Sequence, residues 1–322
     1  MPHVRSILVL TLGLILVGAN RDVGAQAQQK KGAAADKPSP DMADIKYGPH
    51  ERNVLDLWKA KSDSPTPLLV FIHGGGFRAG DKSQLAAALL TRCLESKISV
   101  ASINYRLSQH ATFPAPMLDS ARAVQFIRSK AKEWNLDKTR IAASGGSAGA
   151  GISLWLGFHE DLADPKNADP VLRESTRLTC MGVMGAQSSY DPRFFQKIIG
   201  GKADEHPALM PFYGLKEDEL DSPKAHKLYE EASAINYVTK DDPPVFMFYN
   251  EPKGPLPEDA RPGQGIHHPN FGTALQEKLD PHGIECVLRH VDDHRGGRRD
   301  MNSEMVEFFL KHFRGEKPAA TK

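Results

Sequence analysis

The five residues GGSAG at positions 145–149 separate a strand-like run, 140–144, from an apolar helix-like run, 148–158. This is the pattern G-x-S-x-G, which holds a serine on a sharp strand-to-helix turn with strained backbone angles. Side chains at the flanking positions would clash in such a turn, and glycine leaves room. The pattern predicts a nucleophilic Ser147 above the end of a sheet. It also directs the backbone N–H of Ala148 at a developing oxyanion.

A second glycine motif supports this interpretation, because G-x-S-x-G alone also fits a tight turn with a helix-capping serine. The strand-like run 68–72 leads into HGGGF at 73–77. Gly74 and Gly75 expose backbone N–H groups there, and with Ala148 they would form an oxyanion hole of three donors. A phosphate loop would need the ending G-K-[ST], which is absent. The two motifs together favour an acyl hydrolase.

Strand-like and helix-like segments alternate from about residue 45 to the end of the chain. This alternation predicts an α/β fold with a mostly parallel sheet and helices on both faces. A stretch without a clear strand, 190–237, interrupts the rhythm and predicts a cap-like insertion or a surface decoration. The predicted strands are 54–58, 68–72, 98–104, 140–144, 181–187, 245–249 and 284–291, and the predicted helices are 84–95, 116–134, 148–158, 272–279 and 303–313.

The N-terminus has the three parts of a secretory signal. Arg5 precedes an apolar stretch at 7–19, and small residues follow, so cleavage is expected after Ala25 or Ala27. The 13 apolar residues are short for a membrane span, although an uncleaved anchor is the alternative. We therefore expect a signal peptide at 1–25, a flexible linker at 26–42 and one catalytic domain at 43–315. The mature protein should be secreted or periplasmic, without stable membrane insertion.

Composition excludes several other classes of protein. The chain is 40% apolar and 25% charged, with a formal net charge of +1, so nothing favours a nucleic-acid partner. The three cysteines, Cys93, Cys180 and Cys286, are too widely spaced for a disulfide framework. No Cys/His spacing indicates a metal site, and we expect neither metal nor cofactor.

Three motifs in this order, HGGGF at 73–77, NYRL at 104–107 and GGSAG at 145–149, resemble the esterase/lipase branch of the α/β-hydrolase fold. The likeness is to the hormone-sensitive-lipase and bacterial carboxylesterase type. It implies a serine carboxylesterase without cofactor and a triad in the chain order serine, acid, histidine. In that family the equivalents of His73 and Tyr105 position loops.

The resemblance places the catalytic base after the last strand, where His294 lies in the loop 292–297. The competing residues are His267 and His268, which precede the last strand, and His290, which lies within it. His294 fits both the role and the order, so the sequence predicts it as the base.

The acid departs from the family pattern. Lys253 stands where the register of the predicted strand 245–249 would put an aspartate, and a lysine would oppose a cationic imidazole. Glu251, two residues earlier, is the predicted acid. The alternatives are Asp191, Asp259, Asp292 or a degraded triad.

These observations predict a hydrolase of carboxylic esters that forms an acyl-enzyme on Ser147. The expected substrates are small-molecule esters or esters linked to polysaccharides. The alternative is a non-catalytic member of the fold that binds a small ester or carbohydrate, for which Lys253 is the argument. A peptidase is a weaker third interpretation, because the HGGG loop favours esterases.

Overall fold

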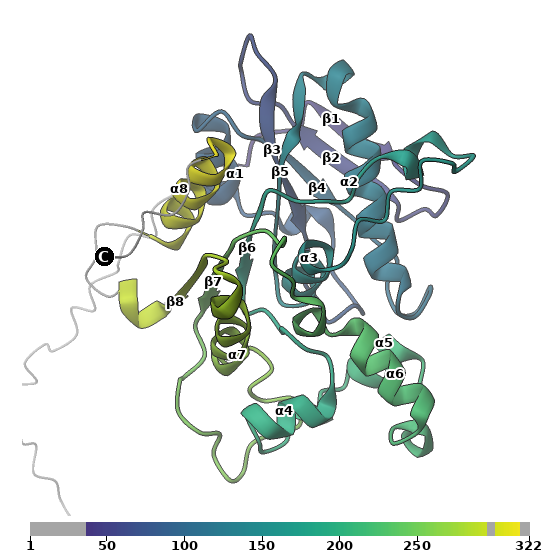
Figure 1. Ribbon diagram of the computed structural model, residues 1–322, viewed down its shortest axis with the longest axis vertical. Coiled ribbons are helices and arrows are strands. Elements are labelled where there is room, and N and C mark those ends of the chain that lie inside the picture. Colours follow the sequence, from purple (N-terminus) through teal and green to yellow (C-terminus); the bar gives the residue numbers. More distant parts are fainter. Residues whose placement is uncertain (1–36, 295–299, 316–322) are drawn as a thin grey trace, which may run out of the picture. The chain divides into compact units, whose positions relative to one another are not determined.

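The computed structural model describes residues 37–294 and 300–315, and within them the chain forms an eight-stranded sheet (Figure 1). The strand order is β1-β2-β4-β3-β5-β6-β7-β8. Strand β2 pairs antiparallel with β1 and β4, and the remaining neighbours are parallel. The predicted α/β architecture is therefore confirmed, with β1 as an additional edge strand. The strands are β1 Met42–Lys46, β2 Val54–Trp58, β3 Thr66–Ile72, β4 Ser99–Ile103, β5 Leu136–Gly146, β6 Cys180–Met184, β7 Val245–Tyr249 and β8 Cys286–His290.

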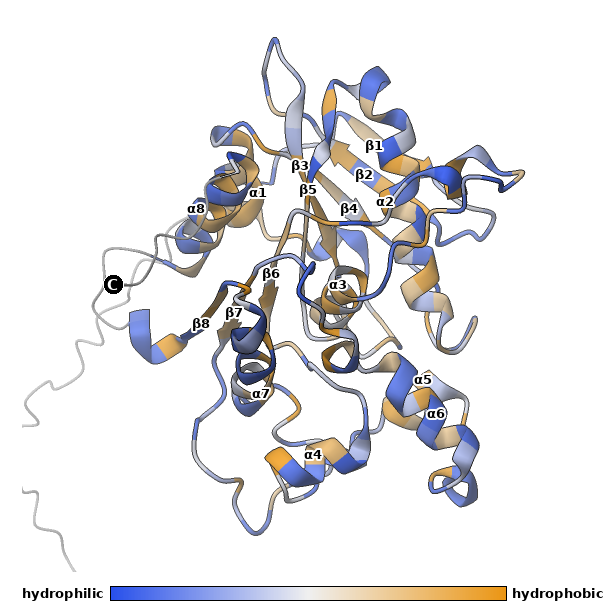
Figure 2. Ribbon diagram, in the orientation of Figure 1, coloured by the Kyte–Doolittle hydropathy of each residue, from blue (hydrophilic) through white to orange (hydrophobic). Residues whose placement is uncertain are grey.

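Helices cover both faces of the sheet because its central strands are apolar on both sides. In β3, Leu68, Val70 and Ile72 pack into one cluster, whereas Leu69 and Phe71 pack into the other. The central strands are mostly hydrophobic, and most of the helices that cover them combine hydrophobic and hydrophilic residues (Figure 2). Helices α1 (Ala87–Glu95) and α8 (Met301–Phe313) pack on one face, and α2 (Ala115–Trp134), α3 (Ala148–Phe158) and α7 (Asn270–Leu279) pack on the other.

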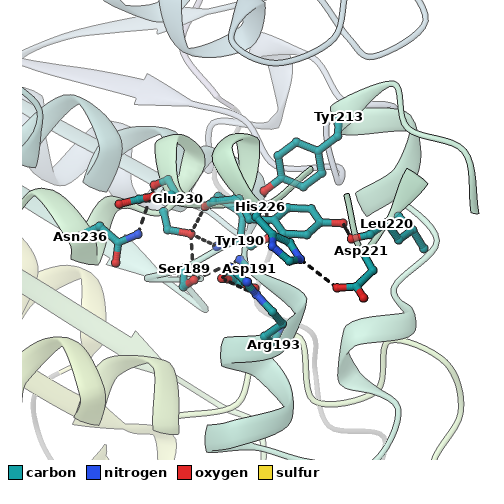
Figure 3. Close-up of polar contacts among 12 residues, drawn as sticks. Ser189, Tyr190, Asp191, Arg193, Tyr213, Leu220, Asp221, His226, Glu230 and Asn236 are labelled. Atoms are coloured by element: carbon teal, nitrogen blue, oxygen red, sulfur yellow. Dashed lines mark hydrogen bonds and ion pairs between the residues drawn. The ribbon is translucent and has the colours of Figure 1, made fainter. Parts of the chain in front are cut away.

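The insertion between β6 and β7 is helical in the structure, and hydrogen bonds hold it where it leaves the sheet. The Ser233 hydroxyl accepts a hydrogen bond from the backbone N–H of Tyr190 (2.9 Å), and Tyr213 donates its hydroxyl proton to the backbone carbonyl of Tyr190 (2.8 Å) (Figure 3). These bonds anchor the insertion to the chain that leaves β6. Its α-helices and 3₁₀ turns are α4 Pro192–Ile198, η3 Ala203–Glu205, α5 Leu209–Tyr213, η4 Glu217–Glu219, α6 Pro223–Ala232 and η5 Ala234–Tyr237.

The expected linker overlaps the described residues only at 37–42, and there the chain contacts the domain. The Trp58 indole donates to the carbonyl of Pro38 (2.8 Å), and the Asp41 carboxylate accepts from the N–H of Lys59 (2.7 Å). Residue Met42 already begins β1. The predicted signal at 1–25 lies outside the described residues. Among the residues that the structure describes, no helix combines the length and apolarity that crossing a bilayer requires.

Candidate active site

Ser147 occupies the strained turn that its motif predicts. Its backbone has φ 53° and ψ −122°, between the end of β5 and the start of α3. A Cβ at Gly145 would lie 2.4 Å from the carbonyl oxygen of Ile72, and a Cβ at Gly149 would lie 2.0 Å from the same atom. Only glycine at both flanks lets the turn pack this close to β3. The backbone N–H of Ser147 is bonded to the carbonyl of Met184 on β6 (2.9 Å), which fixes the turn from the other side.

The glycine loop after β3 lies against this turn. A Cβ on Gly74 would be 2.7 Å from the carbonyl oxygen of Gly146 and 3.5 Å from the Cβ of Ser147, so the loop backbone approaches the serine directly. Gly75 has φ +110°, a conformation that side chains rarely adopt. Ala148 is the first residue of α3, where backbone N–H groups lack intrahelical acceptors. The structure thus brings all three predicted oxyanion residues next to Ser147.

His73 and Tyr105 support the loop from below. Their rings stack with centroids 4.3 Å apart, and the Tyr105 hydroxyl donates to the carbonyl of His73 (2.9 Å). Burial lowers the pKa of His73 to about 4. A neutral ring then donates from Nδ1 to the carbonyl of Gly74 (2.8 Å) and accepts at Nε2 from Arg52 (3.2 Å).

The histidine at the serine is His267. Its Nε2 lies 2.8 Å from Oγ of Ser147 and forms a hydrogen bond with it, which is the geometry that a nucleophile and its base require. The prediction of His294 as the partner of the serine is therefore wrong. The base lies in the connection between β7 and α7, before the last strand instead of after it. Gly185, at φ +54°, makes room for the ring, because a Cβ there would come within 3.2 Å of His267.

His294 ends a 3₁₀ turn, η7 (Val291–His294), and has other partners. Its Nδ1 lies 3.4 Å from the carbonyl oxygen of His290, and its Nε2 lies 3.6 Å from the carboxylate of Glu304 on α8. Its ring meets Phe248 edge-on. The tight turn folds His294 back onto β8 and α8, while His267 holds the hydrogen-bonding position on the serine.

Glu251 is the carboxylate behind His267. Its Oε1 lies 3.4 Å from Nδ1 of His267, and both side chains are about one-third exposed (29% and 34%). The order serine, acid, histidine is kept, as the resemblance implies. The hydrogen bond from the backbone N–H of His290 lowers the pKa of Asp293, and the charge of Lys253 lowers it further. The Lys253 side chain itself is exposed. It therefore does not replace the acid.

The other candidate acids have different roles. Asp191 caps α4 and pairs with the guanidinium of Arg193 at 2.7 Å (Figure 3). Asp292 pairs with Nδ1 of His290 at 3.0 Å, and Asp259 is exposed. None of these contacts reaches His267.

The loop that carries both Glu251 and His267 is held at several points. The adjacent His268 is buried and bonds through Nε2 to the carbonyl of Gly254 (3.0 Å). The amide of Gln187 donates to the carbonyl of Ile266 (2.7 Å), next to the base. His290 on β8 bonds through Nε2 to the backbone carbonyl of Glu251 (2.8 Å). Thus His268 and His290, the two remaining histidine candidates, brace the loop.

One prediction tests the acid directly. Glu251→Gln should lower kcat/KM for an ester by about 10²-fold, because losing the acid removes the group that orients the imidazole and stabilises its cation. The 3.4 Å contact and the partial exposure of both groups keep the loss below that of the base. Turnover between pH 6 and 9 is the measurement, with Asp191→Asn and Asp259→Asn as matched controls. Collapse of a control with normal turnover in Glu251→Gln would contradict the assignment.

Residues 55–254, more than half of the chain, match the model of the BD-FAE family. The chain belongs to the BD-FAE family. The match includes Ser147, the glycine loop and Glu251, whereas His267 lies beyond its end.

Curated relatives of this BD-FAE member are esterases from Mycobacterium tuberculosis. Esterase LipQ is 30% identical over 226 residues, covering 68% of this chain and 50% of LipQ. The probable carboxylic ester hydrolase LipM is 28% identical, covering 64% of this chain and 46% of LipM. The chain thus spans about half the length of these relatives.

Solved structures share the fold. A truncated carbohydrate esterase from gut microbiota superposes with TM-score 0.67 at 20% identity, over 88% of this chain and all of that chain. Esterase Est2 of Thermogutta terrifontis superposes with TM-score 0.60 at 18% identity, over 89% of this chain and 96% of that one. Both confirm the α/β-hydrolase-like architecture of the BD-FAE member.

Proposed function

We propose that this chain is a serine hydrolase of carboxylic esters with Ser147 as nucleophile, His267 as base and Glu251 as acid. The observation that carries the proposal is the 2.8 Å hydrogen bond between Ser147 and His267, with the Glu251 carboxylate on the far nitrogen of the imidazole. A nucleophilic triad consists of a side-chain hydroxyl, a base bonded to that hydroxyl and a carboxylate that orients the base. The esterase names of the curated relatives support the same chemistry.

The proposed reaction has two halves. Ser147 attacks the ester carbonyl while His267 takes the hydroxyl proton, and the backbone N–H groups of Gly74, Gly75 and Ala148 stabilise the oxyanion. His267 then gives the proton to the leaving alcohol, which leaves an acyl-enzyme on Ser147. Water activated by His267 hydrolyses that ester, so every proton transfer involves the same imidazole. The chain itself supplies each group in this scheme.

The test is hydrolysis of p-nitrophenyl esters of increasing acyl length by the purified protein, followed by treatment with a fluorophosphonate. We expect measurable turnover, its loss on treatment and a mass increase on the peptide that contains Ser147. Absence of turnover before treatment, together with absence of labelling after it, would refute the proposal. It would then favour the non-catalytic alternative, whose argument is that Lys253 stands where the family pattern has an aspartate.

We further propose that the protein is exported and acts on small-molecule esters or esters linked to polysaccharides. The support is the apolar stretch at 7–19 and the small residues after it. Mature protein from its native host should begin at Gln26 or Gln28, as N-terminal peptide mapping would show. An intact Met1 in soluble cytoplasmic protein would contradict export.

A further inference from the structure

Two cavities meet at Ser147. The first, here called the cap pocket, has a volume of about 450 Å³ and lies between the glycine loop, Ser147 and the helical insertion. The second, here called the open pocket, has a volume of about 520 Å³ and contains His267 and Asn250 beside Ser147. An ester bound at the serine would therefore extend into both cavities.

The position of His267 assigns the two sides of the ester. The leaving alcohol must receive its proton from the imidazole, so it departs on the side of the base. His267 lines the open pocket, whereas Gly75 and Ala148 line the cap pocket. On the proposed mechanism, the acyl group accordingly lies in the cap pocket and the alcohol in the open pocket.

The cap pocket is mostly apolar, and several of its polar side chains are already bonded. Phe77, Phe212 and Leu209 form its apolar wall. The amide nitrogen of Gln187 donates to the carbonyls of Gly185 and Ile266, and its oxygen accepts from the hydroxyl of Tyr190. The side chains of Arg78 and His206 remain as the polar groups that can serve a ligand.

His206 offers a hydrogen-bond donor. Its Nδ1 accepts the backbone N–H of Ala208 (3.2 Å), which leaves the proton of the neutral ring on Nε2. Burial lowers the pKa of His206, and the nearby guanidinium of Arg78 lowers it further, which favours the neutral ring. Its Nε2–H can then donate to an acceptor in the pocket.

Arg78 offers a positive charge at the rim. One of its N–H groups donates to the carbonyl of Pro207 (3.3 Å) in the insertion, and the guanidinium has further N–H donors for a ligand. Among the described residues that line the cap pocket there is no Asp or Glu. The polar side chains that the cap pocket offers to a ligand are therefore hydrogen-bond donors, and one of them, Arg78, is positively charged.

We propose that the cap pocket selects an acyl group that carries its own terminal carboxylate, so that the preferred substrates are monoesters of short dicarboxylic acids. Arg78 would pair with the carboxylate through its planar fork, and Nε2–H of His206 would donate to it. The apolar wall would enclose the methylene chain between the two ends. This inference rests on the proposed ester hydrolysis and adds the substrate class.

The test uses matched substrate pairs. Aryl monoesters of glutaric, adipic and pimelic acid are compared with the same compounds in which the far carboxylate is a methyl ester. For the best chain length, we expect kcat/KM to favour the free carboxylate by about tenfold. In Arg78→Gln this preference should fall to about one. In Lys197→Gln, which removes an exposed charge on α4 outside the cap pocket, the preference should persist.

The two possible failures are separable. If wild type hydrolyses the methyl esters and does not prefer the free carboxylates, the substrate inference is overturned and the esterase proposal stands. An unchanged preference in Arg78→Gln, or equal loss in Lys197→Gln, would also overturn it. If wild type turns over neither member of any pair, the proposed function itself fails. Comparing the ratio between enzymes removes the intrinsic reactivity of the two esters.

Discussion

Ser147→Ala should lower ester turnover by a factor on the order of 10³ to 10⁶, because the variant has no oxygen to form the acyl-enzyme. The folded structure should survive, since alanine adds no atoms to the turn. The residual rate would come from the oxyanion donors and from substrate binding. Steady-state hydrolysis of a p-nitrophenyl ester, with thermal unfolding of both proteins, is the measurement.

Ser144→Ala is the matched control for this variant. Ser144 is a buried serine on β5, three residues before Ser147, and its hydroxyl contacts the sulfur of Met305 (3.7 Å). Its loss should leave turnover within about threefold. Normal activity in Ser147→Ala would refute the nucleophilic mechanism.

His267→Ala should cost on the order of 10³-fold or more in kcat/KM, which corresponds to about 4 kcal/mol of transition-state stabilisation. The reason is that the imidazole both removes the proton of Ser147 and protonates the leaving alcohol. His294→Ala should retain turnover within about threefold, because the His294 ring contacts His290, Glu304 and Phe248 instead of Ser147. The pair of variants therefore separates the two histidines in one experiment.

The opposite pattern would restore the base predicted from chain order: loss in His294→Ala with normal turnover in His267→Ala. Melting temperatures of both variants show whether either loss reflects unfolding. Added imidazole provides a second check, since it should partly restore a site that lacks only its base.

The fold was largely predictable because its central strands are buried on both faces and therefore apolar throughout. The predicted strand 245–249 and helix 148–158 match β7 and α3. Strand β1 was missed because it is an edge strand with mostly exposed side chains. In the insertion, α4 and α5 were missed because they have only seven and five residues, too few for a periodic pattern.

The site was predictable where its function restricts the residue type locally. Glycines beside Ser147 and in the loop after β3 are required by contacts with backbone atoms, so they appear in the sequence as motifs. Glu251 was found from the register after β7. His267 was considered and set aside because the resemblance places the base after the last strand. Its pairing with Ser147 joins residues 120 positions apart, and no local pattern encodes that contact. The signal that would have favoured it is its place in the same connection as the acid.

Glu251 and His267 lie on one connection of the chain, between β7 and α7, whereas Ser147 lies on another, between β5 and α3. We expect a shift of that connection to move Glu251 and His267 together. Such a shift would change the distance between the imidazole and Ser147 more than the distance between Glu251 and His267. We therefore expect distant destabilising substitutions to act mainly by decoupling the serine from an otherwise intact acid–base pair.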